Sequence, residues 1–437
     1  MLLNKLFKKE DDEKPRRTSR DAKSRPKENR TKRTRIQHQK MDVKDLRVGM
    51  MVVELDIPWE DSPFMFQGLE LKSPADVLAM QEACSYVYVD YDEFSLQKDS
   101  PAGTGLPATP RTSTQLYDVT VEDEFEAAQE VHEFASRTVN NLFEDIRLGG
   151  EVDGAKVKQA VNGCVDSIVR NPDASIWLTR IQAKSETTAQ HSMNVAALSI
   201  VIGKALNMSP QELEDLGCCA VLHDVGKTRV PEEIVMKPGA LTEEETAEIQ
   251  KHCEHGKDIL MATKSVLTGA ADVAHAHHER VDGTGYPRGL QGDKIPRMAK
   301  IVAIAEAYDC MTSRQVYREA ISPSKALQEL YLARGKQFEE DYVVKFIDSI
   351  GIFPPGSVIE MTNGEVAIVL ANTTDKLRPR CILILDAIKE PALQRIVDLS
   401  QMEADDNGDV YQIKTTHNDG AFGIDIADFQ RAGLRIG

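Results

Sequence analysis

The chain has 437 residues, too many for one ordinary hydrophobic core, so two or three domains are expected. Hydrophobic residues make up 41 % and charged residues 28 %, which is typical of a soluble globular protein and argues against a fibrous or membrane-spanning one. The net charge is −17; because residues 1–40 carry 15 Lys and Arg against 6 Asp and Glu, the remainder carries −26, which argues against general nucleic-acid binding by the folded part.

Residues 1–40 are predicted to form a basic disordered tail, because they contain too few large apolar side chains to offset the entropy of ordering. Contact of the tail with anionic lipid or RNA is the alternative to a solvated arm, which we favour. The start of the chain lacks the apolar region and cleavage site of a signal peptide. The seven cysteines form no C-x-x-C pair. A cytoplasmic protein with reduced thiols is therefore expected.

A small α+β domain is predicted for residues 41–97. Short apolar runs between Val43 and Leu55 surround Gly49 and favour strands joined by a turn. A short helix is expected over Ala75–Ala83, and the strict alternation over Ser85–Asp90 is typical of a half-buried strand. Residues 98–118, rich in Pro, Gly, Ser and Thr, are expected to form a flexible linker.

A long helix is predicted for residues 119–148, because apolar positions repeat there at spacings of three and four. The repeating positions are Phe125, Ala128, His132, Ala135, Val139, Leu142 and Ile146. The stripe is equally compatible with a coiled-coil homodimer and with packing on the chain's own catalytic domain.

Residues 149–354 are helical in pattern, with helix starts at Ser209-Pro210, Thr242-Glu243 and Ser322-Pro323. Proline and glycine mark loops at 231–239 and 283–296. From residue 355 to 437 the pattern changes to strands, the clearest of which cover 358–361, 366–370 and 381–385. The fold class is therefore predicted as mainly α, with a small α+β domain before the helical part and a β-rich subdomain after it.

Histidines from separate segments suggest a metal site. His223 is followed by Asp224, His277 by His278, and His191 and His252 lie elsewhere. Neutral imidazoles and carboxylates that converge from several elements suit a divalent transition metal. Adjacent residues on a helix point about 100° apart, so His277 and His278 are not expected to bind one ion easily. The other five histidines, His38, His132, His255, His275 and His417, are predicted to be structural.

Asp224 suits a site with two ions, because a carboxylate can bridge metals roughly 3.5–4 Å apart. Lys227 follows His223 by four residues and would share its helical face, where its charge could reach a phosphate oxygen. These groups fit a phosphoester hydrolase better than chemistry with an organic cofactor.

Five segments in this order resemble the HD-GYP subfamily of HD-domain phosphohydrolases over about residues 150–354. They are VLHDVGK at 221–227, KPGALTEEE at 237–245, HCEHG at 252–256, HHERVDGTGYP at 277–287 and IAEAYDCMTSRQVYR at 304–318. The segment LRVGMMVVELD resembles a domain of unknown function that precedes HD-GYP domains in bacteria.

The resemblance implies a helical HD-domain bundle that hydrolyses cyclic di-GMP in bacterial signalling, with linear pGpG as the product in some members and GMP in others. The implied metal ligands are His191, His223, Asp224, His252, His277, His278 and Glu306. One ion would be held by His191, His223 and Glu306, and the other by His252, His277 and His278, with Asp224 bridging. The implied catalytic pair is Asp224 and Lys227. The implied substrate-binding residues are Lys227, Gly285, Tyr286, Pro287, Arg314 and Arg318, with Tyr286 stacking on guanine and the arginines meeting phosphates.

Two positions depart from the family pattern. Glu306 stands where the family has aspartate, which moves the carboxylate by one methylene; Asp309 could replace it as a ligand, but we favour a supporting role for Asp309. Thr187 stands where members with three metals carry glutamate, so two ions are expected. Iron or manganese is the expected metal, with nickel, cobalt or zinc as alternatives.

The predicted function is therefore a metal-dependent cyclic di-GMP phosphodiesterase. A cyclic di-GMP sensor or scaffold with weak or no hydrolysis is the first alternative, which Glu306 and the additional domains favour. A phosphohydrolase of nucleotides or alarmones is the second, and the GYP loop argues against it. Signalling proteins are expected as partners, without specific nucleic-acid binding or a transmembrane segment.

Overall fold

The computed structural model describes residues 38–47, 50–55, 69–71, 74–90, 116–117, 119–181, 187–263, 269–314, 319–402, 404, 411–424 and 426. The chain divides into two compact units, one within residues 1–109 and the other within 110–437. Among the described residues, no helix is both long enough and apolar enough to cross a membrane.

The first unit is a small antiparallel sheet with one α-helix. Its strands are β1 (His38–Asp42), β2 (Met51–Leu55), β3 (Leu69–Glu70) and β4 (Tyr86–Asp90), in the order β1-β4-β2-β3. Helix α2 (Pro74–Ala83) contributes Met80 to a core that includes Val52 and Val87.

Two predictions for this unit need correction. The first strand begins at His38, inside the range predicted as tail, because it pairs along its whole length with β4. Val43–Asp45 is a 3₁₀ turn rather than a strand, capped by the Asp42 carboxylate, which accepts from the Lys44 N–H at 3.0 Å. Residues 91–97 of the predicted domain, and residues 98–115 and 118 of the predicted linker, lie outside the described residues.

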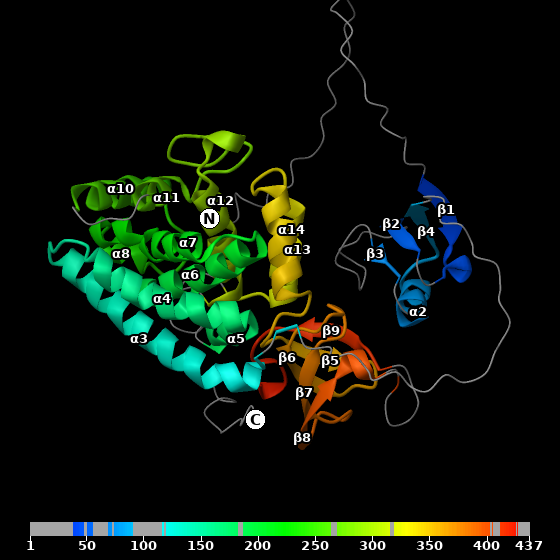
Figure 1. The fold of residues 1–437 in the computed structure, drawn as a ribbon. Coiled ribbons are helices and arrows are strands. Elements are labelled where there is room, and N and C mark those ends of the chain that lie inside the picture. Colours follow the sequence, from blue (N-terminus) through cyan, green and yellow to red (C-terminus); the bar gives the residue numbers. More distant parts are fainter. Residues whose placement is uncertain are drawn as a thin grey trace, which may run out of the picture. The chain divides into compact units, whose positions relative to one another are not determined.

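The second unit begins with a bundle of α-helices (Figure 1). Their bounds are α3 (Val121–Arg147), α4 (Gly154–Arg170), α5 (Pro172–Ile181), α6 (Thr188–Ala205), α7 (Pro210–Leu222), α8 (Glu232–Val235), α9 (Glu243–Gln250), α10 (His252–Ala262), α11 (Ala270–Ala276), α12 (Arg297–Thr312), α13 (Pro323–Ala333) and α14 (Glu340–Ile350). The predicted starts at Ser209, Thr242 and Ser322 are confirmed, because each side chain caps its helix. The predicted loop at 231–239 contains the single turn α8.

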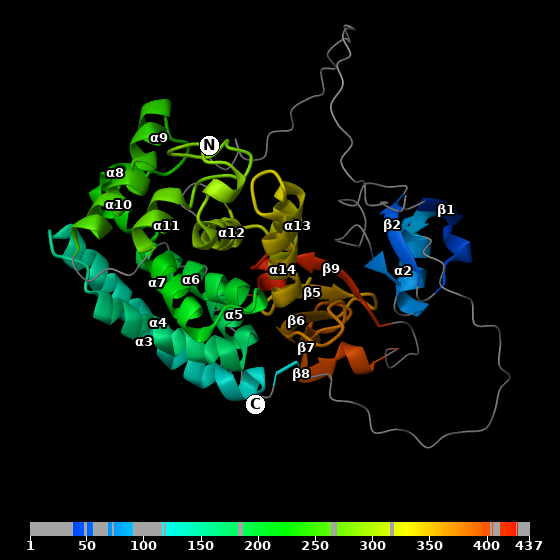
Figure 2. The same ribbon diagram turned by 45° about the horizontal axis from the view of Figure 1, so that its top comes forward.

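The apolar stripe on α3 is buried within the chain. Ala135, Val139 and Leu142 are each at most 3 % exposed, and α3 packs on α4, α5 and α6, with α3 and α4 side by side in both views (Figure 2). The stripe is therefore covered by the chain's own helices. This removes the basis for a coiled-coil homodimer through residues 119–148.

A five-stranded antiparallel sheet follows the helices. Its strands are β5 (Val358–Met361), β6 (Val366–Ala371), β7 (Arg380–Leu385), β8 (Pro391–Asp398) and β9 (Ile413–His417), in the order β8-β7-β6-β5-β9. The three strands expected from the sequence are present, and β8 and β9 are additional. One face of the sheet packs on the bundle through Trp177, whose indole N–H donates to the Leu370 carbonyl at 2.8 Å.

Candidate metal centre

His223 and Asp224 lie where α7 ends and a 3₁₀ turn, Val225–Arg229, begins. The turn can pass close to α10 because position 226 is glycine: a Cβ there would stand 1.9 Å from the His252 carbonyl oxygen. The prediction that Lys227 shares an α-helical face with His223 is therefore wrong. Instead, the Lys227 ammonium donates to Asp224 Oδ2 within the 3₁₀ turn.

Three buried imidazoles are held in the same tautomer. Their Nδ1 atoms lie near backbone carbonyls: His223 near Ala220 at 2.6 Å, His252 near Ile249 at 2.6 Å and His277 near Val273 at 3.1 Å. A carbonyl can only accept, so each Nδ1 carries the proton and each Nε2 presents a lone pair. The Nε2 atoms of His252 and His277 are only 3.1 Å apart, an arrangement that a cation between them would stabilise.

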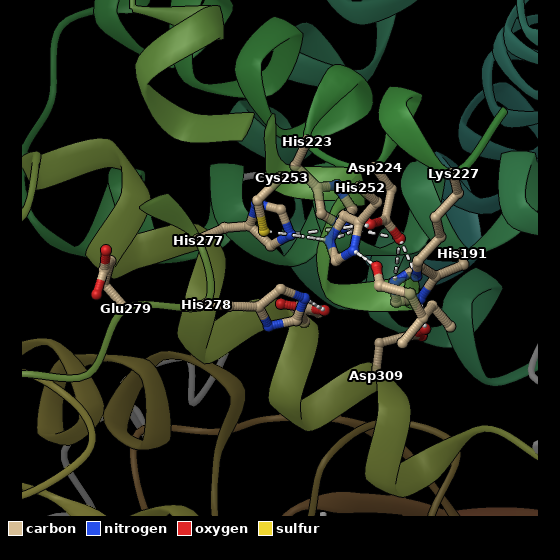
Figure 3. A network of polar contacts seen from close by, with 12 residues as sticks. His191, His223, Asp224, Lys227, His252, Cys253, His277, His278, Glu279 and Asp309 are labelled. Atoms are coloured by element: carbon tan, nitrogen blue, oxygen red, sulfur yellow. Dashed lines mark hydrogen bonds and ion pairs between the residues drawn. The ribbon is translucent and has the colours of Figure 1, made fainter. Parts of the chain in front are cut away.

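The Asp224 carboxylate lies between two groups of histidines (Figure 3). Its Oδ1 is 3.4 Å from His252 Nε2 and 3.8 Å from His277 Nε2. Its Oδ2 is 3.5 Å from His223 Nε2 and 3.7 Å from His191 Nε2. The two oxygens of one fully buried carboxylate thus face different imidazole pairs.

The protonation states of the metal-free residues suit this arrangement. Burial lowers the pKa of His223 and His252 to about 4 and that of His277 well below its usual value, so these rings are neutral near pH 7. Burial alone would raise the pKa of Asp224, but the Lys227 ammonium and the neighbouring imidazoles hold it well below its usual range. The site thus presents an ionised carboxylate among neutral imidazoles.

His277 and His278 lie closer together than their positions on a helix would suggest. Helix α11 ends at Ala276, so the pair stands in the turn beyond it. Their ring centroids are 4.3 Å apart, and both rings approach His252. The expectation that the pair could not easily share an ion assumed a continuing helix, and the turn brings the possible ligand atoms of both within 4.8 Å of each other.

His191 reaches the site from α6 and is oriented by Asp309 of α12. Its Nδ1 is 2.7 Å from Asp309 Oδ2, while Asn194 and Ser313 donate to Asp309 Oδ1 at 3.0 and 3.1 Å. Burial would lower the pKa of His191, but the hydrogen bond to Asp309 and the negative charges of Asp309 and Asp224 together raise it. Asp309 therefore contacts a candidate ligand, in keeping with the supporting role favoured from the sequence.

Glu306 lies within the same site, one turn before Asp309 on α12. Its Oε1 is 3.5 Å from His278 Nε2, and its oxygens fall within 4.8 Å of possible ligand atoms on both His191 and the pair His223 and His277. Burial and the Asp224 carboxylate raise the pKa of Glu306 to about 7. The longer side chain thus still reaches the histidines from the position where aspartate is the family norm.

The donor set fits divalent transition-metal ions. Among the described residues, four groups of possible ligands each lie within 4.8 Å, and His223 Nε2 and Asp224 Oδ1 are buried without a hydrogen-bond partner. A metal ion would provide the missing partner for both atoms. Two of the groups contain a cysteine that the sequence interpretation placed only among core thiols, namely Cys253 and Cys310.

The GYP loop is fixed against the site by tight backbone contacts. A Cβ on Gly285 would lie 2.4 Å from the Arg280 nitrogen, so this approach needs glycine. The next residue, Tyr286, stacks on His278 with centroids 4.6 Å apart and planes at 24°. Glu279, which points away from the histidines in Figure 3, accepts the Arg288 and Leu290 N–H groups at 2.9 Å.

Three arginines near the motifs remain: Arg280, which the sequence analysis did not select, and Arg314 and Arg318, which it predicted to meet phosphates. Arg280 is 5 % exposed, and its charge opposes the rise in the Glu306 pKa. Its position directly after the His277-His278-Glu279 motif could have marked Arg280 as a residue close to the site. Arg314 is exposed and pairs with Glu319 at 3.9 Å. Arg318 lies outside the described residues.

Comparison with known families gives two matches. The HD domain family matches residues 177–341, which contain all seven predicted metal ligands. A family described as a domain of unknown function matches residues 38–157 and so begins where β1 begins.

Known proteins give further matches. A cyclic di-GMP phosphodiesterase of Pseudomonas aeruginosa is 31 % identical over 369 residues, covering 83 % of this chain and 89 % of that protein. A 3′3′-cGAMP-specific phosphodiesterase of Vibrio cholerae is 35 % identical over 164 residues, 37 % of this chain and 31 % of the relative. The solved structure of an HDG"Y"P protein from Bdellovibrio bacteriovorus covers 71 % of this chain and 99 % of its own, with 16 % identity and a TM-score of 0.44.

Proposed function

The chain belongs to the HD-GYP family of cyclic di-GMP phosphodiesterases, and we propose that it hydrolyses cyclic di-GMP to linear pGpG at the site built around His223 and Asp224. The observation that carries this proposal is the Asp224 carboxylate, whose two oxygens face separate pairs of imidazoles within 3.8 Å.

The proposed metal ligands are those expected from the sequence. His191, His223 and Glu306 would hold one ion, His252, His277 and His278 the other, and Asp224 both. When bound, such ions lower the pKa of water and withdraw charge from a phosphodiester. Two ions rather than three are supported by Thr187, whose hydroxyl accepts the Gln190 N–H at 3.2 Å as a helix cap and brings no carboxylate.

The protein's own residues prepare this site in three ways. The backbone carbonyls of Ala220, Ile249 and Val273 fix the Nδ1–H tautomers of His223, His252 and His277, so these three imidazoles need neither rotate nor lose a proton on binding. Burial excludes water from Asp224 and the imidazoles, which strengthens their electrostatic interactions. Near Asp224 Oδ2, the Lys227 ammonium adds a positive charge that could stabilise a phosphate oxygen.

Contacts with the substrate are proposed for Tyr286, Arg314 and Arg318. Tyr286 covers His278, and its stacking on guanine would use the ring face that does not contact the histidine. Arg314 is exposed enough to meet a phosphate, and Arg318 is proposed from the sequence motif alone.

The test combines metal analysis with a hydrolysis assay on the full chain. Purified protein is analysed for metal content and then incubated with cyclic di-GMP and either Fe(II) or Mn(II). We expect about two ions per chain and release of pGpG. Parallel incubation with 3′3′-cGAMP tests the specificity named for the Vibrio relatives. Tight binding of cyclic di-GMP without product under any metal would favour the sensor alternative and contradict the proposal.

A further inference from the structure

We propose that Cys253 is a sulfur ligand to the ion in the His252, His277 and His278 half of the site. This inference rests on the proposed metal centre and adds a ligand that neither the sequence motifs nor the comparisons assign. Cys253 is fully buried. Its Sγ lies 3.5 Å from His252 Nε2 (Figure 3).

The four side chains have the spacing of a single coordination sphere. The possible ligand atoms of His252, Cys253, His277 and His278 all lie within 4.8 Å of one another. With metal–nitrogen bonds of about 2.0 Å and metal–sulfur bonds of about 2.3 Å, neighbouring ligand atoms on one ion are roughly 3–3.6 Å apart. The observed 3.1 Å between the imidazole nitrogens and 3.5 Å to the sulfur fall within this range.

A second observation indicates that this half of the site binds a cation. Asp224 Oδ1 is buried without a hydrogen-bond partner among the described residues and faces His252 and His277. The three histidines are neutral donors, and the Asp224 carboxylate would be shared with the other ion. A thiolate from Cys253, whose proton would pass to solvent on binding, would add a negative charge to this half of the site.

Cys310 is a less suitable sulfur ligand. It groups with His191 and Glu306, where the carboxylates of Glu306 and Asp224 already supply two negative charges. It is also only partly buried, in contrast to Cys253. Cys310 therefore provides a matched control within the same site.

A sulfur ligand would restrict the choice of metal. Thiolate favours Fe(II), Co(II) and Zn(II) over the oxygen-preferring Mn(II) and Mg(II). Of the two metals expected from the sequence, iron would then be preferred over manganese in this half of the site.

The test is cobalt substitution of the full chain. Metal-free protein is loaded with two equivalents of Co(II), and a thiolate-to-cobalt charge-transfer band is expected in the near ultraviolet. Cys253→Ser and Cys253→Ala should lose the band and lower the preference for Zn(II) over Mn(II) by about tenfold or more. Cys310→Ser and the fully buried Cys219→Ser should keep both, and retained visible cobalt bands in the Cys253 variants would show that the histidine site is intact.

X-ray absorption of the zinc-loaded wild type gives a readout that needs no variant. We expect a sulfur neighbour at about 2.3 Å. If the wild type binds two ions and hydrolyses cyclic di-GMP without a sulfur signal, Cys253 is not a ligand and the proposed function stands. If it binds no metal, both proposals are overturned.

Discussion

At the scale of single residues, the site depends on which atom of each side chain already makes a hydrogen bond and which atom remains for a metal ion. His223, His252 and His277 donate from Nδ1 to backbone carbonyls, so their Nε2 atoms remain for a ligand. Asp224 faces both groups through its two oxygens, and Asp309 contacts no other candidate ligand than His191, which it orients, among the contacts described above. Substitution of Asp224 should therefore reduce turnover more than substitution of Asp309.

Asp224→Ala should lower turnover of cyclic di-GMP by more than about 100-fold and reduce metal content, because it removes the only proposed ligand shared by both ions. Asp309→Asn should lower turnover of cyclic di-GMP by about 10- to 100-fold, the usual effect of losing a hydrogen bond that orients a metal ligand. Steady-state kinetics with elemental analysis checks both. Equal losses in the two variants would contradict the separation of their roles.

Glu306→Gln should lower turnover by more than about 100-fold, because a neutral amide supplies no charge to an ion. Glu306→Asp keeps the charge and restores the family's usual residue, so its turnover should stay within about tenfold of the wild type. Both are measured at matched metal occupancy. A large gain for Glu306→Asp would instead show that glutamate weakens the wild-type site.

At the scale of elements, α3 and α6 meet through polar as well as apolar contacts. His132 of α3 is 4 % exposed, and its Nε2 lies 3.4 Å from the Gln190 side chain of α6. Gln190 in turn donates to Asn194, which donates to Asp309. A chain of side chains therefore links the packing of α3 to the residue that orients His191.

His132 should make stability depend on pH. Burial lowers its pKa in the folded chain to about 4 from an ordinary 6.5, so between these values the unfolded chain binds a proton that the folded chain excludes. Above pH 6.5 His132 is neutral in both states and does not lower the free energy of unfolding. As the pH drops to 4, proton uptake by the unfolded chain lowers the free energy of unfolding by about 3 kcal/mol.

His132→Gln removes the titrating group and keeps an amide that can hydrogen-bond. The difference in unfolding free energy between variant and wild type, measured by denaturant titration, should therefore shift in favour of the variant from pH 7 to pH 4. Parallel pH profiles for the two proteins would show that His132 does not contribute.

At the scale of the whole molecule, the catalytic helices and the C-terminal sheet form one unit with a shared core. Trp177 is 1 % exposed and packs among residues of β5, β6 and β7. The buried Asp173 carboxylate accepts two hydrogen bonds from Asn372, at 2.9 and 3.0 Å. The residues that precede this unit form a compact unit of their own.

A chain that ends at Pro354 should not fold stably. It would expose Trp177 and leave Asp173 without the donors of Asn372, and loss of a buried Trp side chain alone costs about 3–5 kcal/mol. Circular dichroism and thermal unfolding of this chain, compared with Trp177→Ala in the full chain, measure the effect. If the chain that ends at Pro354 were stable and active, the sheet would be a separate domain.

A chain of residues 110–437 should keep its metal content and its turnover within about threefold of the full chain, because the candidate ligands and the core that holds them lie in the second unit. Elemental analysis and the hydrolysis assay check this outcome. Loss of activity with intact folding would assign a regulatory role to residues 1–109.

The sequence alone determined the family, the helical class and the residue types of the candidate ligands, because motif spacing and helix caps are local signals. Only the tertiary structure decided how the candidate ligands converge. The turn after α11 that brings His277 and His278 together, the 3₁₀ turn that directs Lys227 to Asp224, and the approach of Cys253 to His252 all depend on where helices end and which backbone carbonyls their packing presents. Where a helix ends and which carbonyls it presents depend on packing between residues far apart in the chain, as His191 and Asp309 are, and a one-dimensional pattern does not record that packing.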